Sequence, residues 1–492
     1  MPSYPETLGH PRPLWMLFMT EFWERFAFYS VSWALALYIV AHFYGGNAIG
    51  QVWASKIYGA YTALIYATSI FGGYAADKIV GYQRSILIGA LVMAIGLFVV
   101  MLPGKQLFLL GLSLVIVGNG LFKPNISSMV GQLYRPGDER RDRGFILFYM
   151  GINGGSLLAP LVTGWLASRF TDTPLQQNYM VVFGAAGIGM LISLFWFWFG
   201  RRGLQGVGRP APAMASRMRM LWVLLGVALG VPLVYLLLTF VDASGLQWLL
   251  NLLFVGVAAM LIVEAKRHDR VQLHRVLAML IIFAFSALFY MFYYQLGTSF
   301  NFLAQNMVDR QMFGGWIFPV GWFQTVNPLA IIVLAPIISH VWALLARHRG
   351  EPSIPGKFGL GLIFNALGFT TLMYALSRVI HNGGSLIPFW PLTVCYVLQS
   401  VGELCLSPIG LSMVTKLAPP RLIGVAMGGW FLSLAAGGNL SGLLAGHISG
   451  ESGMTAASAL SGFTFSFWVL AAAGALLLLI SPFINRLMHG AR

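Results

Sequence analysis

The sequence predicts an all-α polytopic membrane protein, and composition, hydropathy and charge placement all support that fold class. Of its 492 residues, 58% are hydrophobic and only 9% are charged, whereas soluble domains carry about 25% charged residues. Apolar stretches long enough to cross a bilayer, which takes about 20 residues, recur from one end of the chain to the other. We therefore expect many membrane spans rather than a soluble domain with one anchor.

The hydropathy pattern predicts fourteen apolar helices. Several exceed the length that a bilayer requires, so we expect them to tilt or to extend beyond the membrane. The expected helices lie near residues 13–43, 53–76, 85–102, 106–134, 143–168, 179–200, 218–240, 246–264, 276–303, 322–346, 357–379, 388–417, 421–449 and 460–488.

Lysine and arginine are distributed unequally between alternate loops. One side of the predicted membrane holds 23 of them, the other side holds 5, and Arg25 and Lys123 lie within helices. Because cytoplasmic loops collect Lys and Arg, this bias places both termini and the 201–217 loop in the cytoplasm. An even number of helices satisfies that topology. We expect a multi-pass protein of the inner (cytoplasmic) membrane.

The loop at 201–217 is rich in Gly, Pro and Arg and is interpreted as a cytoplasmic linker. Six predicted helices precede it, two nearly uniformly apolar helices follow directly, and six more complete the chain. We therefore expect an N-terminal six-helix bundle at 13–200, a linker and extra helix pair at 201–265, and a C-terminal six-helix bundle at 276–488.

Other protein classes find little support. The net charge of +15 could suggest nucleic acid, but its concentration in alternate loops is typical of membrane topology. Cys395 and Cys405 lie in an apolar stretch without metal or disulfide spacing, and no nucleotide-binding P-loop is present. The N-terminus lacks the pattern of a cleaved signal peptide. We expect no enzymatic activity, no cofactor and no metal.

Three ionisable residues, Glu21, Glu24 and Arg25, share one face of the first predicted helix through spacings of three and four. Two carboxylates and one guanidinium cannot all be neutralised in pairs. A like charge and desolvation both disfavour an ionised carboxylate, so one of the two has a physical reason to hold a proton. A structural ion pair near the helix start is the simpler alternative.

Between the second and third helices, Asp77, Gly81 and Arg84 resemble the D-x-x-x-G-x-x-R loop of the major facilitator superfamily. Gly81 permits a tight turn, while Asp77 and Arg84 can pair or cap helix ends at the cytoplasmic gate. The resemblance implies two helical bundles that rock against each other. An ordinary short charged loop is the alternative.

Lys123 and Glu403 each stand alone on an apolar helix, one in each half of the chain. A lone charge in the membrane needs a partner, and pairing across the halves is the simplest arrangement. Such a salt bridge would act as a gate if it formed and broke as the halves moved. A static bridge that only holds the bundle together is the alternative.

Longer motifs resemble the proton-dependent oligopeptide transporter (POT/PTR) family of the major facilitator superfamily, in particular its bacterial members. The stretch from Glu21 to Tyr29 is similar to the family signature E-x-x-E-R-F-x-Y-Y, with Phe28 in place of the first Tyr. Further similar segments begin at Phe122, Gly151, Gln324, Gly402 and Gly429. The resemblance runs from about residue 12 to the end of the chain.

The resemblance implies a proton-coupled symporter that imports di- and tripeptides by alternating access, with the substrate in a central cavity. Its expected partners are a small peptide, protons and the lipid bilayer, and it is expected to be a monomer. From the charges within the helices, proton coupling is expected at Glu21, Glu24, Arg25 and Glu403. The residues expected to bind substrate are Tyr29, Tyr66, Lys123, Asn153, Gln295, Asn327, Glu403, Ser407 and Trp430.

Two positions depart from the family pattern. Ser32 stands where many relatives carry an arginine for the peptide carboxylate, and Tyr294 stands where many carry a glutamate as a proton site. These departures leave open the transport of another small metabolite or anion by the same fold. A passive channel or a membrane sensor is a further alternative, although no soluble signalling domain is evident.

Tyr294 is not expected to carry the proton, because tyrosine titrates at about 10. The coupled pair Glu21 and Glu24 is expected to be the main proton site, with Glu403 reporting substrate occupancy. Replacing Glu24 with Gln should then remove accumulation driven by a pH gradient and leave substrate counterflow largely intact.

Overall fold

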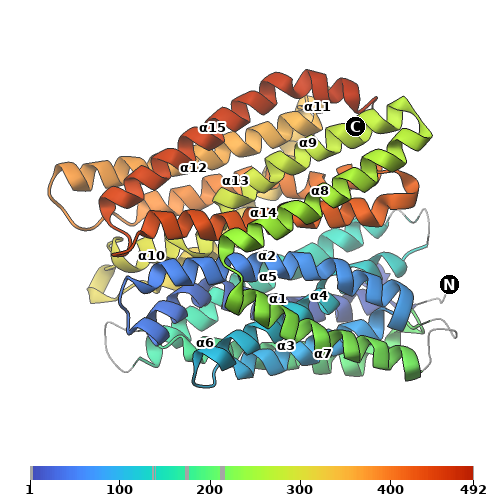
Figure 1. The fold of residues 1–492 in the computed structure, drawn as a ribbon, viewed down its shortest axis with the longest axis horizontal. Coiled ribbons are helices and arrows are strands. Elements are labelled where there is room, and N and C mark those ends of the chain that lie inside the picture. The colour runs from blue at the N-terminus through green and yellow to red at the C-terminus, as the bar shows by residue number, and fades with distance from the viewer. Residues whose placement is uncertain are drawn as a thin grey trace. The chain divides into compact units, whose positions relative to one another are not determined.

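The computed structural model describes residues 4–135, 138, 140–171, 177–210, 217–348 and 350–490. Residues 211–216 of the predicted linker, Arg349 and both extreme termini therefore lie outside the described residues. The chain forms two compact units. The first contains Met1–Tyr38 and Leu64–Asp242, and the second contains Ile39–Ala63 and Ala243–Arg492. Figure 1 shows the course of the chain, coloured from the N-terminus to the C-terminus.

Helices dominate both units, and the described residues include a single pair of two-residue strands, β1 (Glu6–Thr7) and β2 (His10–Pro11). The α-helices are α1 (Arg12–Tyr44), α2 (Gly50–Ala75), α3 (Tyr82–Val99), α4 (Lys105–Gln132), α5 (Arg140–Arg169), α6 (Met180–Gly200), α7 (Arg217–Phe240), α8 (Ala243–His268), α9 (Arg270–Tyr293), α10 (Ser299–Asn306), α11 (Val326–Arg347), α12 (Ile354–His381), α13 (Trp390–Leu417), α14 (Ile423–Ser449) and α15 (Ala456–Leu487).

Thirteen spans of the described chain are long and apolar enough to cross a membrane. The helix α2, with 26 residues, is long enough but falls outside that set because glycines and polar residues lower its hydropathy. Together with α2, these spans correspond one for one to the fourteen helices that the sequence predicts.

The helix expected at 276–303 is not continuous, and this expectation is wrong in detail. The helix α9 ends at Tyr293, a 3-10 turn covers Tyr294–Gly297, and α10 begins at Ser299. A Cβ atom at Gly297 would lie 2.0 Å from the Tyr58 hydroxyl. The break therefore occurs where the ring of Tyr58 packs directly against the backbone, which hydropathy alone does not encode.

Close helix packing in the first unit depends on small residues, as is common for helices in membranes. A Cβ atom at Gly72 of α2 would lie 1.8 Å from the carbonyl oxygen of Gly120 on α4. The hydroxyl of Ser193 on α6 donates to the carbonyl of Thr20 on α1 at 2.7 Å. These contacts place α2 against α4 and α6 against α1.

The second unit has α12 packed against α13 and α15, and α14 packed against α8 and α9. The amide of Asn439 on α14 donates to the carbonyl of Ala243 at 2.7 Å and to the side chain of Gln247 at 3.0 Å, which fixes α8. The preceding helix, α7, packs instead on α4 of the first unit. The two helices of the predicted extra pair therefore belong to different units.

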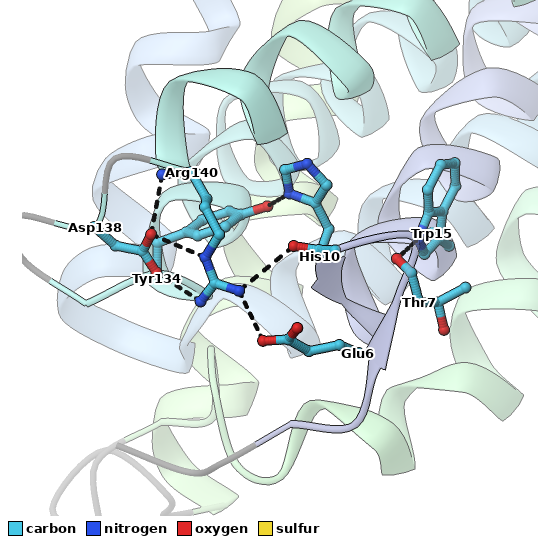
Figure 2. Close-up of polar contacts among 8 residues, drawn as sticks. Glu6, Thr7, His10, Trp15, Tyr134, Asp138 and Arg140 are labelled. Atoms are coloured by element: carbon cyan, nitrogen blue, oxygen red, sulfur yellow. Dashed lines mark hydrogen bonds and ion pairs between the residues drawn. The ribbon is translucent and has the colours of Figure 1, made fainter.

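The start of the chain is fastened to the connection between α4 and α5 (Figure 2). The Arg140 guanidinium pairs with Glu6 at 2.7 Å and with Asp138 at 3.0 Å, and His10 lies 2.9 Å from the Tyr134 hydroxyl. Hydrogen bonds from Arg140 lower the pKa of Asp138, and burial raises the pKa of Tyr134 to about 12.

Candidate functional site in two parts

The charged cluster predicted on α1 is present in the first unit, with its side chains at most 3% exposed. The Arg25 guanidinium is bidentate to Glu24, with Nε to Oε2 at 2.5 Å and Nη2 to Oε1 at 2.6 Å. Its Nε also lies 3.2 Å from Oε1 of Glu21. Glu24 therefore makes two short contacts with the Arg25 guanidinium, whereas Glu21 makes one longer contact.

The two carboxylates also differ in their other neighbours. Asn119 on α4 donates to Oε1 of Glu24 at 3.0 Å. Oε2 of Glu21 is buried and has no hydrogen-bond partner. A buried oxygen without a donor is costly for an ionised carboxylate. The geometry thus separates a fully satisfied Glu24 from an incompletely satisfied Glu21.

Two residues that support the cluster were missed by the sequence analysis. Asn119 stands in the run Gly118-Asn119-Gly120, and a lone amide in an apolar helix four residues before Lys123 is the signal that could have revealed it. Gly155 lets α5 approach α1, since a Cβ atom there would lie 3.0 Å from Cβ of Arg25. A glycine in a glycine-rich helix carries no such signal.

Lys123 lies near the same cluster and faces aromatic rings. Its Nζ is 4.5 Å from the ring centroid of Tyr66 and 5.8 Å from that of Phe28. The guanidinium of Arg25 is 4.7 Å from the same Phe28 ring. Phe28, where the chain departs from the family signature, therefore contacts two cations by its π face. No described carboxylate of the first unit forms an ion pair with Lys123.

Glu403 on α13 is the intramembrane carboxylate that the sequence analysis singled out in the second unit. Its Oε2 accepts hydrogen bonds from the Tyr293 hydroxyl at 2.6 Å and from the Asn327 amide at 3.1 Å. Asn327 also donates to the Ser400 hydroxyl at 2.9 Å. No described basic residue of this unit forms an ion pair with Glu403. The predicted residues Asn327 and Glu403 are thus brought together by neutral hydrogen bonds.

Tyrosines at the end of α9 complete the surroundings of Glu403. The hydroxyls of Tyr290 and Ser407 are 3.0 Å apart. The ring of Tyr294 stacks on that of Tyr290, with centroids 5.3 Å apart. The sequence analysis singled out Tyr294 and Ser407 but missed Tyr290 and Tyr293, although three tyrosines between residues 290 and 294 were a visible signal.

Other residues expected to bind substrate are held by protein groups. Gln295 is fully buried and donates to the Ser441 carbonyl at 3.0 Å. Trp430 is 3% exposed and its ring packs edge-on against Phe283. The amide of Asn153 donates to the carbonyl of Tyr149 at 2.9 Å. Tyr29 packs edge-on against Phe28.

The loop motif between α2 and α3 is a tight turn. Asp77 accepts a hydrogen bond from Tyr82, and Gly81 adopts φ of 78°, a conformation that favours glycine. Asp77 and Arg84 form no ion pair with each other; Arg84 instead lines a pocket with arginines 201, 202 and 209.

Ionisable groups buried among membrane-length helices define a class of polytopic membrane transporter, in which such groups mark substrate and proton pathways. Within that class the family is clear. A sequence model of the POT family matches residues 83–459, and the chain belongs to this family. The predicted family and fold class are thereby confirmed.

Curated relatives cover nearly the whole chain. The peptide transporter YePEPT of Yersinia enterocolitica subsp. palearctica is 37% identical over 98% of this chain and 96% of its own length. Dipeptide and tripeptide permease B of Salmonella typhimurium is 34% identical over 89% of this chain and 87% of its own length.

Solved structures agree with these relatives. A peptide transporter POT in complex with alafosfalin has a TM-score of 0.85 at 33% identity, over 99% of this chain and 97% of that one. A POT family transporter in complex with 5-aminolevulinic acid has a TM-score of 0.82 at 30% identity, over 97% and 98%. Tetrameric PepTSo2 has a TM-score of 0.81 at 26% identity, over 96% and 99%.

Proposed function

We propose that this protein is a proton-coupled symporter that imports di- and tripeptides by alternating access. Membership of the POT family and the names of its relatives support the reaction class. The observation that carries the coupling is the buried cluster of two carboxylates around one guanidinium, in which one oxygen of Glu21 lacks a partner.

Glu21 is the residue we assign to the transported proton. With both carboxylates ionised, the cluster carries one excess negative charge in a site that is almost closed to water. Protonation of Glu21 removes that charge and leaves the bidentate pair of Arg25 and Glu24 undisturbed. Glu24 and Arg25 are therefore proposed as positioning residues.

The amino group of the peptide is proposed to bind Glu403. Its carboxylate is oriented by Tyr293 and Asn327, both neutral donors, so its negative charge remains available for an ammonium group. Gln295 is hydrogen-bonded to the Ser441 carbonyl and Trp430 is buried. Both are therefore proposed to shape the site rather than to contact the peptide.

Lys123 is proposed to bind the peptide carboxylate. Ser32, at the position where many relatives carry arginine, donates to the carbonyl of Phe28 at 2.9 Å and supplies no cation. Aromatic rings of Tyr66 and Phe28 hold the ammonium group of Lys123 without neutralising it. The predicted gate between Lys123 and Glu403 also remains a proposal, and replacement of either residue by Ala should abolish proton-driven uptake.

Uptake of labelled dialanine by proteoliposomes tests the proposed function. With an inward proton gradient, the internal concentration should rise above the external one, and a protonophore should collapse it. Without a gradient, uptake should stop at equality. Equal uptake with and without the gradient would contradict proton symport. Absence of uptake for both labelled dipeptides and labelled tripeptides would contradict peptide transport.

A second candidate is a small amino-group metabolite as substrate. It is favoured by the missing cation at Ser32 and by the relative bound to 5-aminolevulinic acid. Competition distinguishes the candidates: excess dialanine should block labelled 5-aminolevulinic acid if one site serves both. Uptake of the metabolite that dialanine leaves unchanged would favour the second candidate.

Both termini and the linker are proposed to be cytoplasmic, in the inner membrane. In a background without Cys395 and Cys405, a cysteine at Arg209 should resist an impermeant thiol reagent in intact cells. A cysteine at Arg378, on the side predicted to hold few positive charges, should react and serves as the control. Reaction at 209 alone would reverse the topology.

The transporting species is proposed to be the monomer. The ion pairs of Glu21 and Glu24 with Arg25 are complete within a single chain, so this cluster needs no residue from a second copy. Light scattering coupled to size exclusion, corrected for detergent, should give the mass of a single chain of 53.9 kDa. A mass four times larger, as the tetrameric PepTSo2 structure illustrates, would contradict the proposal.

A further inference from the structure

Four arginines of the first unit surround a pocket that the proposed transport cycle does not use. The pocket has a volume of about 430 Å³, roughly that of fourteen water molecules. It lies where the start of α3 meets the turn after α6 and the described part of the linker. Its lining residues are Gln83, Arg84, Arg201, Arg202, Arg209 and Pro210.

The walls of the pocket are fixed by backbone contacts. The backbone NH of Gln83 donates to the carbonyl of Gly208 at 2.9 Å, and its side chain donates to the carbonyl of Val207 at 2.7 Å. A Cβ atom at Gly81 would lie 2.6 Å from the backbone nitrogen of Pro210. The linker is thus held against the start of α3, and Gly81 is what permits the approach.

The charge of the pocket is unbalanced. No described carboxylate forms an ion pair with Arg84, Arg202 or Arg209. Arg201 lies over the Trp198 ring, with its guanidinium carbon 3.8 Å from the ring centroid, which fixes its direction without neutralising it. Four like charges around one concavity repel each other unless an anion binds between them.

Arginine and phosphate are well matched. The planar guanidinium forms paired hydrogen bonds with phosphate oxygens, and basic pockets between membrane helices bind lipid headgroups. A solvated charged surface is the simpler interpretation, but it does not account for a concave wall built by three separate chain segments. The chemistry therefore favours a phosphate ester as the ligand.

The position of the pocket favours a lipid as the source of that phosphate. It adjoins the ends of two membrane-spanning helices, α3 and α6. The last turns of α6 expose Trp196, Trp198 and Phe199, and exposed tryptophans are typical of the level of lipid headgroups. A separate groove of about 960 Å³, lined by apolar residues of α1 and α6 that include Trp196 and Phe199, offers a surface for acyl chains.

We propose that this arginine pocket binds the phosphodiester headgroup of an anionic phospholipid from the leaflet on its side of the membrane. The bound lipid would hold the linker, α3 and α6 together. The proposal is independent of which substrate the protein transports.

Native mass spectrometry of the purified full-length protein tests this proposal. The probe is phosphatidylglycerol, titrated into the detergent-solubilised protein. The variant combines Arg84→Gln, Arg202→Gln and Arg209→Gln, and leaves Arg201 on Trp198. We expect its apparent dissociation constant for the first bound lipid to rise about tenfold or more, because charge-assisted hydrogen bonds are lost.

A matched control removes three exposed arginines at helix ends of the same predicted side, through Arg270→Gln, Arg347→Gln and Arg421→Gln. It has the same net charge as the pocket variant and should bind the first lipid as the unmodified protein does. Equal weakening in both variants would show a diffuse charge effect and would overturn the site.

Two further probes separate the lipid from other sources of phosphate. Phosphatidylcholine should bind at least about tenfold more weakly, and soluble glycerol phosphate should fail to displace the lipid at equal concentration. Equal binding of phosphatidylcholine or displacement by glycerol phosphate would overturn the lipid assignment. If the triple variant fails to fold, Arg209→Gln on the exposed linker replaces it. Its affinity for phosphatidylglycerol should fall about threefold, and an unchanged affinity would overturn the proposal.

Discussion

The two carboxylate sites of this protein are built on opposite principles. In the first unit, Glu21 and Glu24 share the guanidinium of Arg25, and the site has one negative charge more than it has positive charges. In the second unit, Glu403 has no basic partner among the described residues of that unit. Neutral donors, Tyr293 and Asn327, hold its carboxylate instead.

This difference indicates what each site lacks. The first site already has its cation, and a proton on Glu21 is enough to balance it. The second site has its hydrogen bonds but no cation, so a substrate ammonium group can supply one. These properties support the proposal that the first site takes the proton and that the second binds the amino group of the substrate.

Replacement of Glu21 by Gln should have the largest effect, because it makes the first site permanently neutral. A gradient of one pH unit provides about 1.4 kcal/mol per proton, which corresponds to about tenfold accumulation. In Glu21→Gln the accumulation ratio should fall to about one, while counterflow of labelled dialanine persists. Proteoliposome uptake measures both quantities.

Glu24→Gln is the control for that experiment. It breaks the bidentate hydrogen bonds that hold Arg25, and it leaves Glu21, whose Oε2 has no partner, as the ionised neighbour of that guanidinium. We therefore expect it to lose counterflow, accumulation and thermal stability together, in place of the selective loss of accumulation that the sequence alone predicts. Continued accumulation by Glu21→Gln, or a Glu24→Gln protein that loses accumulation alone, would contradict the division of roles.

Replacement of Glu403 by Gln tests the second site. The affinity for dialanine should fall by about ten- to a hundredfold, since a charge-assisted hydrogen bond contributes about 1.5–3 kcal/mol. A dipeptide acetylated on its amino group should bind both forms equally. Tyr293→Phe removes one orienting donor and should have a smaller effect. Thermal shift measures these affinities. An affinity of Glu403→Gln for dialanine equal to that of the unmodified protein would contradict the assignment.

The turn that ends α9 offers a test of how the second site is positioned. Gly297→Ala brings a methyl group against the Tyr58 ring, and overpacking of this kind costs about 1–3 kcal/mol. The midpoint of thermal unfolding should fall accordingly. Gly256→Ala, with no atom within 4 Å of the added Cβ, is the matched control and should be neutral. Equal midpoints in the two variants would contradict the close packing.

The ion pair between Arg140 and Asp138 is a partly exposed reference for the buried cluster, and its effect should be the smallest. Because the pKa of Asp138 is lowered in the folded state, its stabilisation is present above the ordinary aspartate value of about 4 and is lost as the pH falls through the lowered value.

Thermal unfolding of the unmodified protein and of Asp138→Asn should therefore differ slightly at pH 7. The difference should disappear in strong acid. A difference that grows as the pH falls would contradict the assigned direction of the pKa shift.

Hydropathy was sufficient to predict every long helix, because a bilayer span needs length and apolar side chains and little else. Its failure at the end of α9 is instructive. At this break the ring of Tyr58, more than 200 residues earlier in the chain, packs directly against the backbone of Gly297. A local pattern cannot contain a contact of that kind.

The sequence by itself determined the family and the membrane class, and it singled out the charged residues within helices, because charges in apolar helices are rare. Only the tertiary structure decided how those charges are shared. Glu21 and Glu24 are equivalent in the motif. In the structure, Asn119 and Arg25 donate hydrogen bonds to Glu24, whereas Oε2 of Glu21 has no hydrogen-bond partner. Hydrogen bonds depend on distances between helices, which spacing along one helix does not set.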